Sequence, residues 1–286
     1  MSDALWRVAL REGPRLARGP VEDGPREVIG SGVTLADLLS RGGPLLDDLP
    51  DEGPLPADVR VIAPVDVQPV WASGVTFERS RSARMAESEE SADIYDRVYD
   101  AERPELFLKA MPGESRGSGE HITVRADSTW DVPEPELGIV ADARGRAAGY
   151  VLGNDVSSRS IEGENPLYLP QAKVWEGSCS LGPCIVPIEH APALDEMTIS
   201  LVVRRGDDVS FSDTVELKRM RRGVDDLLSW LYRAKRFPYG TVLLTGTSIV
   251  PDDSFTLQAD DEVEIATPGL GSLVNTVRSL DAGLSG

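Results

Sequence analysis

Short apolar segments, separated by turn-forming residues, run through most of the chain and restrict it to a mainly β fold. Each segment spans four to seven residues, which suits a strand and is too short for an ordinary helix. One amphipathic helical pattern lies near residues 223–236, and a charged one with few apolar residues covers 78–100. We therefore predict a protein of the α+β class in which strands dominate. The predicted strands are Leu106–Ala110, His121–Val124, Leu137–Val140, Ala147–Gly153, Cys184–Pro187, Thr198–Arg204, Thr241–Thr245 and Glu262–Ile265.

The first 65 residues differ in residue pattern from the remainder, which indicates a separate module. Gly- and Pro-rich stretches divide its short apolar segments, and residues 40–58 have the composition of a loop or linker. A buried strand pattern follows at residues 69–75. We predict a small N-terminal domain over residues 1–65 and a larger domain over residues 66–286.

The acidic balance of the chain excludes two classes of partner. Its 48 acidic and 29 basic residues give a formal net charge of −19, and such a surface repels nucleic acid phosphates and anionic lipid headgroups. No apolar run reaches membrane-spanning length, and residues 1–11 lack the apolar core of a signal peptide. Two cysteines are too few for a disulfide framework. We expect a cytoplasmic protein that binds neither nucleic acid nor membranes.

Two glutamates at the start of an apolar strand pattern are the strongest local indication of a site. Glu134 and Glu136 lie two residues apart, so a strand places both side chains on the same face. Like charges held that close are costly unless a cation or a shared proton offsets them. Carboxylate oxygens favour a hard ion such as Mg²⁺, Mn²⁺ or Ca²⁺. Taken alone, the pair also fits a solvated strand edge.

Further polar positions follow apolar segments and are candidates for the same site. Asp155 lies just after the strand pattern of Tyr150–Gly153, although a turn or a helix cap explains it as well. Lys173, one of four lysines, lies in an apolar stretch, where a lysine can serve in proton transfer or simply extend from a strand edge. Thr245 and Thr247 flank a glycine, and their hydroxyl groups and neighbouring amides can bind a substrate carboxylate.

The order and spacing of these motifs resemble the fumarylacetoacetate hydrolase family. E-P-E-L-G, G-N-D-V-S-S-R, Q-A-K-V-W with S-L-G-P, and L-L-T-G-T follow one another along the chain. Each motif is common by itself, whereas the ordered set is specific. The resemblance covers about residues 66–280 and implies the β-rich fold of that family, a mixed β-sandwich or roll.

The resemblance also implies roles for individual residues. Glu134, Glu136 and Asp155 would bind Mg²⁺ or a similar ion. Lys173 would help to bind or ionise the substrate, and Thr247 would contact the substrate carboxylate. The resemblance further suggests a homodimer or a homotetramer.

The sequence departs from the hydrolases of the family in the segment expected to cover the site. Those enzymes carry G-x-N-Y-x-x-H-x-x-E, in which the histidine and the glutamate activate water. Here Ser80 and Ala83 stand at those two positions, and the two histidines of the chain, His121 and His190, lie elsewhere. The departure counts against ordinary hydrolysis of an acylpyruvate. Three further stretches, N-P-L-Y-L-P-Q-A-K, E-L-F-L-K-A and G-V-T-F-E-R-S, resemble the sugar-acid branch of the family, whose members dehydrate 2-dehydro-3-deoxy-pentonates to 2,5-dioxopentanoate.

We therefore predict a metal-dependent lyase that removes water from a small anionic 2-oxo acid. Lys173 is the expected base, Glu78 is expected to assist the leaving hydroxyl group, and Ser80 is expected to contact the substrate. One alternative is a hydrolase or decarboxylase of the same family that acts on an acylpyruvate or on oxaloacetate. Another is a catalytically silent binding protein, which Lys173 and the three carboxylates argue against.

Overall fold

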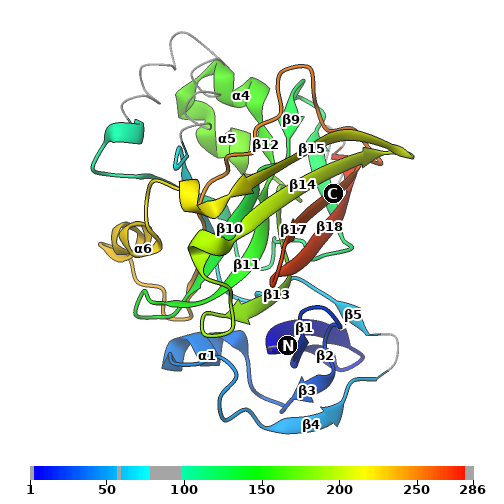
Figure 1. Ribbon diagram of the computed structural model, residues 1–286, viewed down its shortest axis with the longest axis vertical. Coiled ribbons are helices and arrows are strands. Elements are labelled where there is room, and N and C mark those ends of the chain that lie inside the picture. The colour runs from blue at the N-terminus through cyan, green and yellow to red at the C-terminus, as the bar shows by residue number, and fades with distance from the viewer. Residues whose placement is uncertain (1–2, 57–58, 78–97, 281–286) are drawn as a thin grey trace.

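Strands dominate the computed structural model, which describes residues 3–56, 59–77 and 98–280 (Figure 1). The strands are β1 (Asp3–Leu10), β2 (Gly13–Pro20), β3 (Glu27–Ile29), β4 (Asp51–Pro54), β5 (Arg60–Val61), β6 (Val70–Gly74), β7 (Glu105–Ala110), β8 (His121–Arg125), β9 (Asp131–Val132), β10 (Pro135–Ala141), β11 (Ala147–Asp155), β12 (Ser157–Ser158), β13 (Cys179–Pro187), β14 (Thr198–Arg205), β15 (Asp208–Glu216), β16 (Thr241–Leu244), β17 (Glu262–Thr267) and β18 (Gly271–Leu280). The helices are α1 (Leu35–Arg41), α4 (Arg159–Glu164), α5 (Leu169–Lys173) and α6 (Val224–Tyr232), with 3₁₀ turns η1 (Pro166–Tyr168), η2 (Leu194–Glu196) and η3 (Leu217–Arg219).

Two sheets form the body of the molecule. The larger has the strand order β4-β3-β2-β1-β13-β11-β10-β16-β6-β7, with β5 also paired to β1, and the second has the order β15-β14-β17-β18-β8. Two pairs are parallel, β16 with β6 and β18 with β8. One hydrophobic cluster joins Leu137 and Ile139 of the larger sheet to Leu201 and Ile265 of the second. The predicted mixed β-sandwich is thereby confirmed.

Strand β10 is buried on both faces, which explains why its sequence does not alternate between apolar and polar residues. Leu137 and Ile139 belong to the cluster between the sheets, whereas Val140 belongs to a second cluster that includes leucines of α1. Gly138 lets the neighbouring strands pack closely, because an added Cβ would lie 2.7 Å from the Val151 side chain. The polar side chain at the start of this strand, Glu136, is therefore removed from water.

The strand ends of the larger sheet gather the polar residues at one edge. β10 begins at the edge where its antiparallel neighbours β11 and β16 end. β6 is parallel to β16 and ends there too, and β7 begins there because it is antiparallel to β6. Helices α4 and α5 contact each other and lie at the top of Figure 1. The fold thus brings together segments that are far apart in the sequence.

The N-terminal strands are hydrogen-bonded to the main sheet. β1 pairs with β13 through Leu5 opposite Ile185, and β1 to β5 and α1 lie at the bottom of Figure 1. Helix α1 begins with a capping box, in which the side chains of Thr34 and Asp37 each accept a hydrogen bond from the other residue's backbone amide. A domain boundary near residue 65 stays a prediction.

Several local expectations were wrong. The predicted strand Cys184–Pro187 is only the second part of β13, which begins at Cys179 because pairing with β11 outweighs local preference. Strand β4 lies inside the expected loop 40–58, and β15 and β18 were not foreseen. The charged helical pattern over 78–100 lies almost wholly outside the described residues. Among the described residues, every helix falls short of the length and apolar character needed to cross a membrane.

Replacing Asp131 by Asn should stabilise the protein at neutral pH. Asp131 lies in β9, and its burial raises the pKa of its carboxyl group to about 6. In the unfolded chain the carboxyl ionises near pH ~4, so above pH 6 the folded state carries the cost of a buried charge, and that cost disappears as the pH falls below 4. We expect D131N to raise the free energy of unfolding by about 1–3 kcal/mol at pH 7.5 and by little at pH 4. Urea denaturation at both pH values measures this.

Asp127 provides the matched control for this experiment. It lies in the loop that precedes β9, and a hydrogen bond from Arg125 lowers the pKa of its exposed carboxyl group. D127N should therefore lower the free energy of unfolding at neutral pH, by less than about 1 kcal/mol. A D131N protein no more stable than the unchanged protein at pH 7.5 would contradict the assigned cost of the buried charge.

Candidate metal centre and active site

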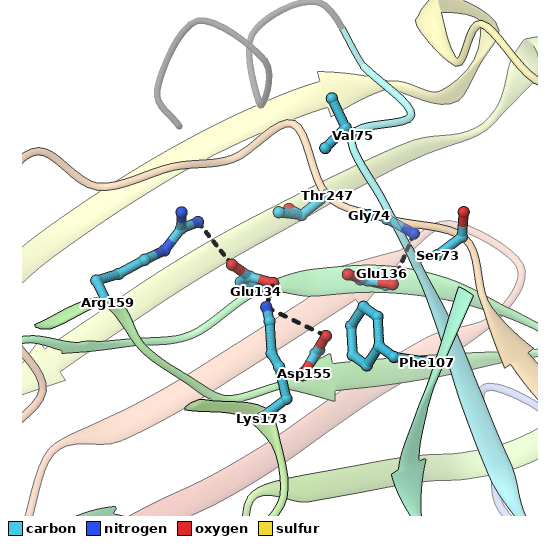
Figure 2. Close-up of a pocket in the computed structure, with 11 residues that line it drawn as sticks. Ser73, Gly74, Val75, Phe107, Glu134, Glu136, Asp155, Arg159, Lys173 and Thr247 are labelled. Carbon is cyan, nitrogen blue, oxygen red and sulfur yellow. Dashed lines mark hydrogen bonds and ion pairs between the residues drawn. The ribbon is translucent and has the colours of Figure 1, made fainter. Parts of the chain in front are cut away.

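Three carboxylates meet where β10 begins and β11 ends. Glu136 lies opposite Gly153 in the register of the two strands, and the Asp155 amide donates to the Glu134 carbonyl at 3.0 Å. This register places all three acidic side chains on one face. One oxygen of each lies within 4.8 Å of the others, and all three residues are buried. Figure 2 shows the carboxylates of Glu134, Glu136 and Asp155 close together.

Two cations from the short helices offset part of this negative charge. Lys173 ends α5, and its Nζ donates to Glu134 Oε2 at 2.7 Å and lies 3.5 Å from Asp155 Oδ2. Arg159 begins α4, and its Nη2 donates to Glu134 Oε1 at 2.6 Å. Both cations are buried. Glu134 is therefore held through both of its oxygens, as Figure 2 shows.

A backbone amide holds the third carboxylate, Glu136. The amide of Gly246 donates to Glu136 Oε2 at 2.7 Å. Burial, followed by the negative charges of Asp155 and Glu134, raises the pKa of Glu136 well above its usual range. A divalent cation would relieve this repulsion, and oxygen donors are the ligands that Mg²⁺, Mn²⁺ and Ca²⁺ prefer. The donor set therefore fits the predicted metal ion.

The carboxylates and both cations line a pocket whose other walls come from β6, β7 and the loop after β16. Val75 has a φ of 54°, in the left-handed region that is unfavourable for a β-branched residue. The next residue is held in place, because the Thr76 hydroxyl donates to the Thr245 carbonyl at 2.6 Å and the Arg221 amide donates to the Thr76 carbonyl at 2.9 Å. These contacts keep the strained turn at the pocket. The wall residues are Ser73, Gly74, Val75, Phe107, Gly246 and Thr247.

The structure places some of the predicted site residues in the pocket and others outside it. Glu134, Glu136, Asp155, Lys173 and Thr247 all line the pocket. The Thr245 hydroxyl instead donates to the Leu137 carbonyl at 2.9 Å, and Thr245 is not among the described residues that line the pocket. Glu78 and Ser80 lie outside the described residues, so their proposed roles stay predictions.

The comparison with known families gives the same grouping as the motifs. The sequence profile described as fumarylacetoacetate (FAA) hydrolase, C-terminal, matches residues 95–278. The chain belongs to the fumarylacetoacetate hydrolase family.

Two relatives within this family come from archaea. The chain is 48% identical over 223 residues to a probable 2-keto-3-deoxyxylonate dehydratase of Haloferax volcanii, across 78% of this chain and 76% of that protein. It is 41% identical over 224 residues to the 2-dehydro-3-deoxy-D-arabinonate dehydratase of Saccharolobus solfataricus, across 77% of this chain and 75% of that protein.

Solved structures of family members give the same fold. The apo form of 2-keto-3-deoxy-D-arabinonate dehydratase superposes with a TM-score of 0.85 at 34% identity, covering 98% of this chain and 100% of that one. A structure of 2-keto-3-deoxy-D-arabinonate dehydratase complexed with magnesium and 2,5-dioxopentanoate gives a TM-score of 0.84 at 33% identity, covering 98% and 99%. The family's fold therefore extends over both sheets.

Sequence reasoning missed three residues with charged or aromatic side chains at this site. Arg159 and Phe107 line the pocket, and Lys109 Nζ lies 2.6 Å from Asp155 Oδ1 behind it. One signal was available, because 25 of the 29 basic residues are arginines and lysine is rare in the chain. Two of the four lysines, Lys109 and Lys173, are fully buried at the carboxylates.

Replacing Glu136 by Gln should have opposite effects on stability with and without metal. Without metal, the amide removes a buried like charge but keeps an oxygen for the Gly246 amide, so we expect the free energy of unfolding to rise by about 1–2 kcal/mol. With Mn²⁺ at 100 times its Kd, the unchanged protein should gain about 2.7 kcal/mol, whereas E136Q should gain far less. Denaturation in EDTA and in Mn²⁺ measures both effects.

The exposed Glu216 supplies the control. Its carboxylate pairs with Lys218 at the surface, remote in sequence from the pocket residues. E216Q should respond to Mn²⁺ as the unchanged protein does. If Mn²⁺ stabilised E136Q as strongly as the unchanged protein, Glu136 would not be a metal ligand.

Proposed function

We propose that the protein is a hydro-lyase that converts a 2-dehydro-3-deoxy-pentonate into 2,5-dioxopentanoate. The observation that carries the proposal is the buried set of three carboxylates with Lys173 in hydrogen-bond contact with Glu134. The names of the two archaeal relatives, both dehydratases of 2-oxo-3-deoxy sugar acids, support the same substrate class. A solved relative named for bound magnesium and 2,5-dioxopentanoate supports both cofactor and product.

The pocket residues divide into metal-binding, proton-transferring and substrate-binding groups. Glu134, Glu136 and Asp155 hold the divalent cation. When bound, Mg²⁺ supplies a Lewis acid that polarises the 2-oxo acid and makes its C3 protons more acidic. Thr247 binds the substrate carboxylate at the pocket wall, next to the backbone amide of Gly246.

Lys173, acting as the neutral amine after its ammonium group has given up a proton, removes a proton from C3 of the substrate. Its Nζ is buried and lines the pocket, so substrate and amine meet away from bulk water. The C4 hydroxyl group leaves with one proton as water, and tautomerisation then converts the C5 carbinol into an aldehyde. The net change is the loss of one water molecule. Glu78 is proposed to protonate the leaving hydroxyl group, and Ser80 to contact the substrate.

The positions of the two histidines support elimination over hydrolysis. His121 begins β8, and His190 is exposed and hydrogen-bonds the carbonyl of Asp3 at 2.8 Å. Neither is among the described residues that line the pocket. A hydrolase would need a base to activate a nucleophilic water, whereas elimination needs a base only for the C3 proton.

We further propose that the enzyme acts in the cytoplasm as a homodimer or homotetramer.

A direct assay tests the reaction. Purified protein is incubated with Mg²⁺ and with 2-dehydro-3-deoxy-pentonates of both C4 configurations, and 2,5-dioxopentanoate is measured with a coupled aldehyde dehydrogenase. We expect product that disappears with EDTA, from one configuration in preference to the other. Cleavage of an acylpyruvate or loss of CO₂ from oxaloacetate, with no product from either pentonate, would move the enzyme to the hydrolase or decarboxylase activity.

Replacing Lys173 by Met should remove turnover even at saturating Mg²⁺. Met has a similar length but cannot accept a proton, so we expect kcat to fall by about 10²–10⁴. Lys218→Met is the control, because that lysine is exposed and pairs only with Glu216 among the described contacts. Near-normal turnover of K173M at saturating Mg²⁺ would assign the base to another group.

A further inference from the structure

One buried lysine of the site does not line the pocket. Lys109 lies in β7 and is fully buried, and it is not among the described residues that form the pocket walls. Its ammonium group donates to the Val156 carbonyl at 2.8 Å and to the Lys173 carbonyl at 2.5 Å, and lies 2.6 Å from Asp155 Oδ1. Of the three N–H donors of an ammonium, two serve these carbonyl groups, and the contact with Asp155 is an ion pair.

The three oxygen atoms around this ammonium come from the two segments that position the reacting groups. Asp155 ends β11 and Val156 follows it, while the Lys173 carbonyl lies at the last residue of α5. The ring of Trp175 covers the same ammonium, with its centroid 5.2 Å from Nζ. A single nitrogen atom from a third element therefore joins a proposed metal ligand to the backbone of the proposed base.

The two buried lysines have different tasks. Lys173 directs its ammonium into the pocket, towards Glu134, as Figure 2 shows. Lys109 approaches the same carboxylate cluster from β7 and contacts Asp155 through Oδ1, whereas Lys173 lies nearer Oδ2. The opposed contacts fix the rotation of the Asp155 carboxylate.

We propose that Lys109 is a positioning residue that sets the orientation of Asp155 and the placement of Lys173 for metal binding and proton transfer. The inference rests on the proposed function for its catalytic part. The part that concerns metal binding rests only on the contact between Lys109 and Asp155. Because the Lys109 ammonium holds both groups at one point, its loss releases two groups that must act together, and small misplacements of reacting groups cost large factors in rate.

Lys109→Met tests this role, because Met fills a similar volume without donating hydrogen bonds. We expect Mn²⁺ binding to the apo-protein, measured by calorimetry without substrate, to weaken by about 10–100-fold. At saturating Mn²⁺ we expect kcat to fall by about 10–100-fold with a smaller change in KM, because Lys109 does not line the substrate pocket. Lys218→Met should match the unchanged protein in both measurements.

Lys109→Arg separates the effect of the donor positions from the effect of the positive charge. It also provides a test if K109M does not fold. Arginine keeps the positive charge but spreads its donors over a planar fork, which cannot bring one nitrogen to three converging oxygen atoms. We expect K109R to bind Mn²⁺ at least about 10-fold more weakly than the unchanged protein. Binding and kcat like those of the unchanged protein, in folded K109M or in K109R, would overturn the proposal. Absence of dehydratase activity in the unchanged protein would instead refute the proposed function and leave the metal-binding comparison intact.

Discussion

Repulsion among three buried carboxylates is the constraint on which the site depends. At the separation of 4.8 Å that bounds the cluster, two unit charges in a protein environment repel by about 3–4 kcal/mol. The chain offsets this with two lysines, an arginine and a backbone amide, each brought by a different element. β7, α4, α5 and the loop after β16 therefore each contribute a group that offsets this repulsion.

The sheet strengthens this repulsion, because it places the carboxylates at an edge from which water is largely excluded. β10 is covered on both faces, so Glu136 cannot turn towards water. The pairing of β10 with β16 brings together strand ends that are separated by about a hundred residues of sequence. The parallel pairing of β16 with β6 then adds the wall around Val75, whose left-handed backbone is held by contacts on both sides of the next residue. Strain of this kind persists where surrounding structure fixes it, as it does at many functional sites.

The sequence predicted the local part of this arrangement and could not predict the part that depends on long-range packing. Period-two spacing placed Glu134 and Glu136 on one face, and the strand end placed Asp155, because both follow from backbone geometry within a few residues. Strand β15 escaped notice since its sequence is polar and largely exposed, and only its pairing with β14 makes it a strand. The roles of Arg159 and Lys109 depend on where α4 and β7 pack, which no local pattern encodes.

The choice of cation at each position follows from the number and direction of the acceptors. Lys109 meets acceptors that converge on one point, which suits an ammonium, whereas Arg159 reaches Glu134 with one arm of its guanidinium and approaches Glu162 with another at 3.9 Å. With every group ionised, which is the state before Lys173 loses its proton to act as a base, the four acids and three bases of this cluster leave one negative charge. A divalent cation reverses the sign of that charge, and a substrate with one carboxylate then neutralises it. A small monoanionic 2-oxo acid is therefore the class of ligand whose charge the buried site can accept at least cost.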